Sequence, residues 1–471
     1  MLLRRFYDDK LAQASYMIGC QANGEALVVD PHRDAGVYLR AAEEEGLSIR
    51  YVAETHIHAD YLSGARQLAK EAGSTLLLSG DGGDDWQYGF AHDDGAQIVH
   101  DGDVVKLGNI VIEVLHTPGH TPEHISFMVT DGAAHTEPMG ILSGDFIFVG
   151  DVGRPDLLEK AAGVEDTMEE SARVLYRSLG RFRDFPGYLQ ILPGHGAGSA
   201  CGKALGSVAS STLGYEQLVN WAFQCESEDD FVAQVLQDQP EPPTYFAHMK
   251  RMNRDGPPLI DALPKPLCLD PSMLSGLLED EAVVVDTRSR GDFERGHVPG
   301  TINVPLANDF PTWCGWLLPY DRPIYFVAAS QDIANEAARD LAFIGLDAVA
   351  GYFDEEALER WRDEKGELET TAVIDWEAAE VAVRDENALL VDVRRTTEWN
   401  EGHVAGARHV HLGYLRGRRD ELPTDRPILL YCRTGNRSGI GTSLLLAEGC
   451  SDVRNIDGGM IDRMKRGLPI E

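Results

Sequence analysis

Residues 49–61, IRYVAETHIHADY, place a short β-branched and aromatic stretch directly before three side chains that can bind metal ions. The first part of this stretch predicts a β-strand, so His56, His58 and Asp60 fall on the loop that follows it. Polar residues at a strand end can meet residues from neighbouring strand ends along one edge of a sheet. The stretch therefore predicts an α/β fold with a metal site at the edge of a sheet.

The same arrangement recurs along the first half of the chain. Further strand-like runs are ALVVDP (26–31), STLLLSG (74–80), NIVIEVLHTPGH (109–120), HISFMV (124–129), ILSGDFIFV (141–149) and YLQILPGHG (188–196). They add His120, Asp145 and His195 as candidate ligands at or after strand ends. His92, His100, His116, His124 and His135 have no comparable claim. Apolar residues at helical spacing from Val164 to Phe182 predict a helix over one face of the sheet.

Composition excludes several classes of partner. The formal net charge of −35 argues against nucleic acid, because phosphate binding needs clustered Lys and Arg. The sequence has no run close to the ~20 apolar residues of a membrane span and no signal-peptide pattern at its start, so we expect a cytoplasmic protein without a membrane partner. Seven scattered cysteines predict reduced thiols rather than a disulfide framework. We expect a homo-oligomer.

The second half contains an internal repeat. AVVVDTRSRGDFERGHVPGTINVPL (282–306) matches ALLVDVRRTTEWNEGHVAGARHVHL (388–412), and each copy alternates buried-looking strands with an amphipathic helix. This alternation predicts two α/β domains with parallel sheets. The Pro- and Gly-rich segment 238–259 reads as a connection, so the predicted domains are 1–255, 256–371 and 372–471.

The later copy carries a candidate catalytic cysteine. LLYCRTGNRSG places Cys432 at a strand end, before a short loop and a helix from about Ser438. Inward-pointing loop amides and a helix N-terminus stabilise a thiolate or persulfide, and Arg433 and Arg437 add positive charge for anions. In the earlier copy this cysteine is replaced by Ala328, so that copy is expected to be catalytically silent, as a spacer or docking surface, with Cys314 structural.

Residues 1 to about 255 resemble the metallo-β-lactamase superfamily, through THIHADY, HTPGHTP and the Gly-Asp of SGDFIF. The resemblance implies an αβ/βα sandwich. Tyr61 replaces a histidine that helps to hold the second ion of two-metal relatives, and a phenol with a pKa near ~10 is a poor substitute. In the persulfide dioxygenase branch the ligands of one Fe(II) fall on His56, His120 and Asp145, a two-histidine, one-carboxylate set. His58, Asp60, Tyr61 and His195 would then surround these ligands.

Three residues are candidates for substrate binding. Cys201 and Lys203 lie in the Gly-rich GAGSACGK stretch that follows His195, and Arg154 in GDVGRPD could anchor an anionic carrier thiol. Each has an ordinary alternative: Cys201 as a small buried thiol and Arg154 in a surface pairing. The alternative for the whole domain is a zinc thioester hydrolase of the glyoxalase II type, with a sulfur-relay tail.

Residues 372–471 resemble the rhodanese family through VDVR, EWNEGHVAGA, CRTGNRS and IDGGM. The whole chain resembles bacterial persulfide dioxygenase-sulfurtransferase fusions of the CstB type. This resemblance implies that a low-molecular-weight thiol persulfide and O₂ give sulfite at the iron, and that Cys432 transfers sulfane sulfur to sulfite to give thiosulfate. A phosphatase, whose related loop is one residue longer, and a sulfur-trafficking or redox-sensing module with a structural metal are the contrasting hypotheses.

Overall fold

The computed structural model describes residues 1–157, 167–199 and 205–471. These residues form two compact units. The first comprises Met1–Ala262 with Phe343–Gly345, and the second comprises Leu263–Ala342 with Leu346–Glu471. The predicted domain borders at 255/256 and 371/372 stay predictions.

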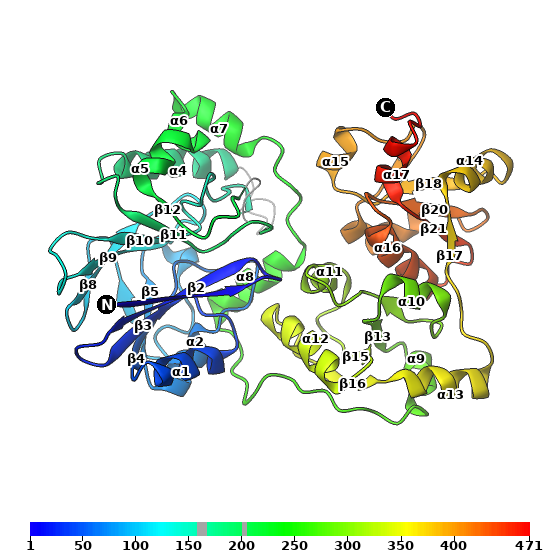
Figure 1. The fold of residues 1–471 in the computed structure, drawn as a ribbon, viewed down its shortest axis with the longest axis horizontal. Coiled ribbons are helices and arrows are strands. Elements are labelled where there is room, and N and C mark those ends of the chain that lie inside the picture. Colours follow the sequence, from blue (N-terminus) through cyan, green and yellow to red (C-terminus); the bar gives the residue numbers. More distant parts are fainter. Residues whose placement is uncertain (158–166, 200–204) are drawn as a thin grey trace. The chain divides into compact units, whose positions relative to one another are not determined.

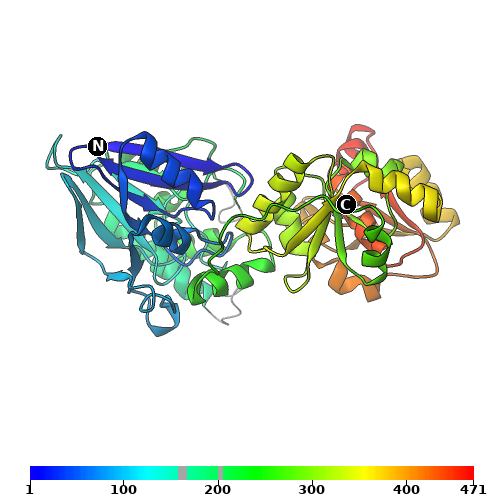
Figure 2. The same cartoon turned by 90° about the horizontal axis from the view of Figure 1, so that it is seen from below.

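The N-terminal unit contains two six-stranded sheets, which can be followed in Figures 1 and 2. The first sheet has the order β1(Leu2–Asp8), β2(Gln13–Cys20), β3(Glu25–Val29), β4(Ser48–Ala53), β5(Thr75–Ser79), β6(Gln97–Val99). The second has the order β12(Ser211–Thr212), β11(Gln190–Pro193), β10(Gly140–Gly144), β9(Ile125–Asp131), β8(Ile110–His116), β7(Val104–Leu107).

Strand β2 shows how the core of this unit is organised. Its residues are buried on both faces, and alternate side chains belong to different apolar clusters. Tyr16 and Ile18 pack between the two sheets, whereas Met17 packs towards the helices on the outer face. Because successive side chains of a strand point to opposite faces, one strand contributes to both layers. The result is a sandwich of two sheets with helices outside, as predicted.

The helices of this unit cover the outer faces of the sheets. The helices of this unit among the described residues are α1(Ala35–Glu44), α2(Ala65–Ala72), η1(Asp84–Trp86), α4(Met168–Phe182), α5(Leu213–Val219), α6(Trp221–Gln224), α7(Glu228–Leu236) and α8(Tyr245–Asp255). Helix α4 confirms the predicted amphipathic helix over its described part, and it buries Leu175, Leu179 and Phe182 against the second sheet. Within the described ranges, no helix is both long and apolar enough to cross a membrane.

The second unit contains two parallel sheets, one for each copy of the repeat. The earlier copy has the order β14(Ile302–Asn303), β13(Val283–Asp286), β15(Ile324–Val327), β16(Val349–Phe353). The later copy has the order β17(Ala372–Ile374), β21(Val453–Ile456), β20(Ile428–Tyr431), β18(Leu389–Asp392), β19(Arg408–His409). The helices are α9(Met273–Glu279), α10(Arg290–Arg295), α11(Phe310–Leu317), α12(Gln331–Phe343), α13(Glu355–Lys365), α14(Trp376–Asp385), α15(Thr396–Asn400), η2(Leu412–Tyr414), η3(Arg416–Glu421), α16(Asn436–Ala447) and α17(Gly459–Lys465).

The two copies share the same local structure after their first strand. Arg288 binds Asp286 through Nε and Nη2, and Arg394 binds Asp392 in the same way. Each arginine also donates to a glycine carbonyl eight residues later. The repeated ion pair fixes the turn that leaves the strand, and it confirms that the sequence repeat is a structural repeat.

Candidate metal centre and cysteine loop

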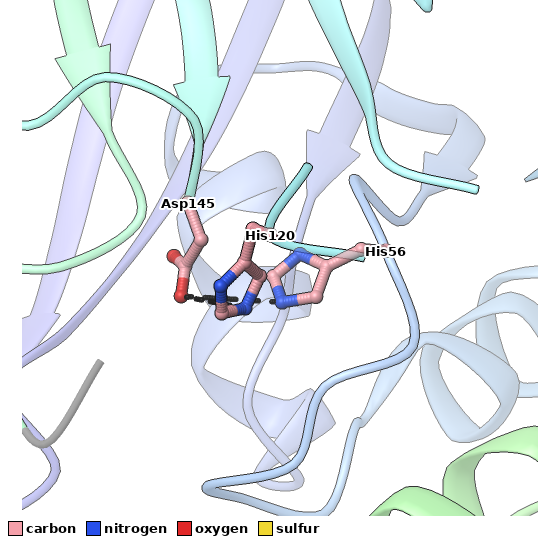
Figure 3. Close-up of side chains that lie close together, drawn as sticks. All are labelled: His56, His120 and Asp145. Carbon is pink, nitrogen blue, oxygen red and sulfur yellow. Dashed lines mark ion pairs between the residues drawn. The ribbon is translucent and has the colours of Figure 1, made fainter. Parts of the chain in front are cut away.

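Three candidate ligands meet at the ends of three strands. His56 follows β4, His120 follows β8, and Asp145 follows β10. Their ligand atoms lie within 4.8 Å of one another, and all three side chains are buried. Nε2 of His56 lies 4.0 Å from Oδ2 of Asp145, and Nε2 of His120 lies 3.6 Å from the same oxygen (Figure 3). The geometry brings two imidazoles and one carboxylate to a single point.

The surroundings orient these side chains for metal binding. Nδ1 of His120 lies 3.0 Å from the carbonyl oxygen of Arg154, and Nδ1 of His56 lies 3.0 Å from Oγ1 of Thr55. Both Nε2 atoms are thereby left to face Asp145. Neither carboxylate oxygen of Asp145 accepts a hydrogen bond from any described residue. Because a buried carboxylate without hydrogen bonds is costly, this donor set fits a cation.

The protonation states agree with a ligand role. Burial lowers the pKa of His56 well below its usual value, and the neighbouring His58 and His120 lower it further. Burial also lowers the pKa of His120, against the opposing effect of Asp145. Both imidazoles are therefore neutral at physiological pH, the form that binds metal.

His58 has a different environment. Its Nε2 lies 3.2 Å from Oδ1 of Asp30. Burial opposes its charge, but Asp30, with Glu54 and Asp60, raises the pKa of His58 to about 9. A protonated imidazole has no lone pair for a metal, so His58 is suited to hold the ligand loop through its ion pair with Asp30.

Tyr61 is buried beside His58. Its Oη lies 3.4 Å from the Asp30 carbonyl oxygen, and the Gln13 side chain donates to it at 3.4 Å. Burial raises the pKa of Tyr61 well above its usual value. The phenol therefore keeps its proton and cannot replace the charge or donor strength of a ligand to a second ion.

Asp60 and His195 form a neighbouring pair. Nε2 of His195 lies 3.2 Å from Oδ2 of Asp60 and 3.5 Å from Oδ1 of Asp145. Nδ1 of His195 lies 3.1 Å from the carbonyl oxygen of Ala12, so its Nε2 faces the carboxylates. The pair lies beside Asp145, and its predicted supporting role is compatible with this position.

Of the three candidates for substrate binding, only Arg154 lies among the described residues. Cys201 and Lys203 lie outside the described residues. Arg154 is fully buried, where Nε and Nη2 bind the two oxygens of Asp156 and Nη2 also donates to the carbonyl of Pro240. The anchoring of a carrier thiol by Arg154 stays a prediction. Its described contacts favour a structural role, because its backbone carbonyl orients the ring of His120.

Sequence reasoning missed His124, which has a clear role in the structure. Its Nε2 accepts a hydrogen bond from the backbone N–H of Asp145 at 3.0 Å, and its Nδ1 lies 2.8 Å from Oγ1 of Thr117. Its ring also stacks on His56, with centroids 5.0 Å apart. His124 therefore positions two candidate ligands at once. Its place at the start of the HISFMV strand, four residues after His120, was the available signal.

Asp30 was missed as well. Its Oδ1 accepts from the backbone N–H of Thr55 at 2.7 Å, and its Oδ2 accepts from the Thr55 hydroxyl at 2.8 Å. Asp30 also contacts His58, so it holds the residue directly before His56 and the residue two positions after it. It ends the ALVVD run just as the other candidates end their strands, so its position could have been noticed.

Cys432 lies directly after β20 and is buried. The backbone N–H of Gly435 donates to its Sγ at 3.2 Å, and the Ser438 hydroxyl lies 3.5 Å from the same sulfur. Gly435 has a φ of 98°, in the left-handed region that glycine accepts, and helix α16 begins at the next residue. The loop thus turns two hydrogen-bond donors towards the sulfur atom of Cys432.

The two arginines of the loop differ in their contacts. Arg437 is half-buried and donates two hydrogen bonds to Glu398, from Nη1 at 2.6 Å and from Nη2 at 2.7 Å. Arg433 is exposed and forms no ion pair with any described residue. Their predicted binding of anions stays a prediction. If Arg437 binds an anion in this conformation, it does so while its guanidinium is also paired with Glu398.

The earlier copy has Ala328 after β15, where the later copy has its cysteine. A pocket of about 650 Å³ remains beside the following residue, Ala329, with Arg288 and Arg362 in its wall. Cys314 lies on α11 and is fully buried, and burial raises its pKa well above the usual value. An inert thiol on another element agrees with a catalytically silent copy.

Known protein families match both the domain that carries the candidate metal centre and the two copies of the repeat. Residues 8–195 match the metallo-beta-lactamase superfamily, and residues 270–360 and 376–462 match the rhodanese-like domain. A crystal structure of a metallo-beta-lactamase from Staphylococcus aureus subsp. aureus COL is 44% identical, with a TM-score of 0.70, and the match covers 75% of this chain and 99% of that one. The chain belongs to the metallo-β-lactamase superfamily. It joins a domain of this superfamily to two rhodanese-like domains.

Curated relatives of the superfamily domain include proteins with different names. "Persulfide dioxygenase ETHE1, mitochondrial" from Mus musculus is 29% identical over 204 residues, which cover 41% of this chain and 68% of the relative. "Hydroxyacylglutathione hydrolase" from Rhodospirillum rubrum is 28% identical over 185 residues, which cover 38% of this chain and 60% of the relative. The superfamily domain of this chain is thus similar to proteins named persulfide dioxygenase and to proteins named hydroxyacylglutathione hydrolase.

Proposed function

We propose that this chain oxidises thiol persulfides with O₂ to thiol and sulfite, and that Cys432 then transfers sulfane sulfur to sulfite, giving thiosulfate. The observation that carries the proposal is the buried set of His56, His120 and Asp145, whose carboxylate has no hydrogen-bond partner among the described residues. A two-histidine, one-carboxylate set leaves room for both O₂ and a sulfur donor on one metal ion. The relation to persulfide dioxygenases supports the same reaction.

The first reaction is RSSH + O₂ + H₂O → RSH + SO₃²⁻ + 2H⁺, in which the sulfane sulfur loses four electrons to O₂. One Fe(II), held by His56, His120 and Asp145, would supply the electron exchange that lets O₂ react with a persulfide. The protein keeps both imidazoles neutral through burial and fixes their rotation through Thr55 and the Arg154 carbonyl. His124 orients Asp145 through its backbone N–H.

The second reaction has two steps at Cys432. Its thiolate attacks the outer sulfur of RSSH, which releases RSH and leaves a cysteine persulfide. Sulfite then attacks the terminal sulfur, which forms thiosulfate and returns the thiolate. The Gly435 amide and Ser438 hydroxyl are placed to stabilise the negative sulfur in both states. A shared chain raises the effective concentration of sulfite at the second site.

A zinc thioester hydrolase is the second candidate, because hydroxyacylglutathione hydrolases are among the relatives. Two features count against it. Tyr61, which stands where two-metal relatives have a histidine, has a pKa raised well above its usual value by burial, so it keeps its proton and is a poor ligand for a second ion. The rhodanese-like domains also have no evident use for a thioester.

Oxygen uptake with metal analysis tests the proposal. We expect protein purified without oxygen to contain about one iron per chain and to consume O₂ when given glutathione persulfide, with sulfite or thiosulfate as product. Protein with two zinc ions that hydrolyses a glutathione thioester would instead establish the hydrolase. Metal-containing protein that relays sulfur without consuming O₂ would establish a trafficking module.

A further inference from the structure

Helix α10 of the silent copy packs on the cysteine loop of the active copy. A methyl group added at Gly435 would lie only 2.3 Å from Nη1 of Arg290, and one added at Gly439 would lie 2.9 Å from its Cδ. The guanidinium therefore rests directly on the backbone of Gly435. This is the same residue whose N–H donates to Sγ of Cys432.

Arg290 is held in this position by acidic residues on both sides. Its Nη2 donates to Oδ1 of Asp457 at 2.9 Å, and its Nε lies 3.6 Å from Oε1 of Glu294. Asp457 leads into the turn whose Met460 N–H donates to the carbonyl of Cys432 at 2.9 Å. Nη1 is buried and has no hydrogen-bond partner among the described residues. It is an unused donor beside the loop.

A second side chain of the same helix reaches the loop through Asn455. The amide Nδ2 of Asn455 donates to Oε1 of Glu294 at 3.0 Å and to the carbonyl oxygen of Gly435 at 3.2 Å. Gly435 is thus contacted from the silent copy in two ways, by the guanidinium of Arg290 and, through Asn455, by Glu294. Both contacts act on the turn that points an amide at the sulfur.

These contacts are not a general property of the repeat. In the alignment of the two copies, Arg290 corresponds to Thr396 and Glu294 corresponds to Asn400. The residues that form the repeated ion pair, by contrast, are the same in both copies. The silent copy has therefore lost its cysteine while carrying two charged residues that serve the loop of the other copy.

We propose that the silent copy is a positioning domain for the Cys432 loop and that Arg290 is its main positioning residue. Its guanidinium fixes the Gly435 turn and offsets the negative charge of Asp457 and Glu294 beside a loop that receives anions. The inference rests on the proposed function in taking Cys432 as the sulfur carrier. Small errors in the placement of a donor reduce rates strongly, so a fixed turn has a direct kinetic value.

The test uses the full chain, with thiosulfate as sulfur donor and cyanide as acceptor. For Arg290→Ala we expect kcat/KM for thiosulfate to fall about tenfold, mainly through a higher KM, because the turn loses its support and the carboxylates of Asp457 and Glu294 are left uncompensated near the anion. Arg290→Lys keeps the charge and should return the value to within about threefold of the wild type. Arg295→Ala is the matched control, since Arg295 lies on the same helix but is exposed and pairs with Asp292.

Arg290→Gln keeps most of the side-chain volume and takes the place of the alanine variant if that variant does not fold. Wild-type KM and kcat in Arg290→Gln or Arg290→Ala would overturn the inference, as would a lysine variant no better than alanine or an equal loss in Arg295→Ala. Cys432→Ser is measured in parallel. Sulfur transfer that survives in Cys432→Ser contradicts the proposed function itself, whereas loss there with normal kinetics in Arg290→Ala contradicts only this inference.

Discussion

Arg437 and Glu398 form a two-bond ion pair across the mouth of the cysteine loop, with donor–acceptor distances of 2.6 and 2.7 Å. Glu398 begins the family motif EWNEGHVAGA, and Arg437 ends CRTGNR, so the pair ties together two segments far apart in sequence. Burial opposes the charge on Glu398, but the bonds from Arg437 prevail and lower its pKa. The pair therefore persists through the whole neutral range.

Glu398→Gln should weaken sulfur transfer. Loss of the charge replaces two charge-assisted bonds by weaker ones and loosens the first turn of α16, which costs about 1–2 kcal/mol. We expect about a tenfold fall in kcat/KM for thiosulfate in a steady-state assay. Glu421→Gln provides the control, because Glu421 forms a similar two-bond pair with Arg418 within η3, outside the cysteine loop sequence. Equal effects of the two substitutions would show that the pair has no special role at the cysteine.

Cys432→Ser should separate the two reactions. The hydroxyl cannot carry a persulfide, so O₂ uptake with glutathione persulfide should continue while the product changes from thiosulfate to sulfite. Product analysis by ion chromatography measures the change. Cys450→Ser, which alters a half-buried thiol elsewhere in the same copy, should leave the products as they are. An unchanged thiosulfate yield in Cys432→Ser would remove Cys432 from the mechanism.

Asp145→Ala should lose metal and O₂ uptake together. The substitution removes the only carboxylate of the three-residue set and leaves two neutral imidazoles, which bind a divalent ion far more weakly. Elemental analysis and an oxygen electrode measure the two losses on one preparation. Asp93→Ala, at an exposed aspartate of the same domain, is the control. A variant that kept one iron per chain would show that Asp145 is not a ligand.

The His58–Asp30 pair should make the stability of the metal-free chain depend on pH. Because the folded pKa of His58 is about 9 and its ordinary value is 6.5, the pair contributes fully below pH 6.5 and loses its contribution as pH rises to 9. The change amounts to at most about 3 kcal/mol. Urea unfolding of the wild type and of His58→Gln should give stabilities that converge over this range. A difference independent of pH would mean that His58 is neutral in the folded state.

Cys314 should resist alkylation in the native protein. It is fully buried, and burial with the nearby Asp340 and Asp309 raises its pKa, so both access and thiolate are lacking. Iodoacetamide labelling followed by peptide mass spectrometry should modify the exposed Cys268 in the folded chain and Cys314 only in denaturant. Fast labelling of Cys314 in the folded chain would show that this thiol is accessible and reactive, and would contradict its structural role in the silent copy.

The sequence by itself determined the architecture and the residue types of both sites. Strand-end positions predicted a group of candidate metal ligands, and the family resemblance singled out His56, His120 and Asp145 among them. That these three residues follow strands of two different sheets was not visible in the sequence. The repeat predicted two copies of one domain, and the replacement of a cysteine by Ala328 predicted which copy is silent. These inferences rely on periodicity and on residue type, and both are visible in a single chain.

Only the tertiary structure decided how the side chains are used. It turned His124 towards the backbone of Asp145, buried Arg154 with Asp156, paired Arg437 with Glu398, and brought Arg290 of one copy onto Gly435 of the other. The physical reason is that a hydrogen bond depends on distances of a few tenths of an ångström between elements far apart in sequence. Those distances come from the packing of sheets and helices against one another, which residue spacing does not encode.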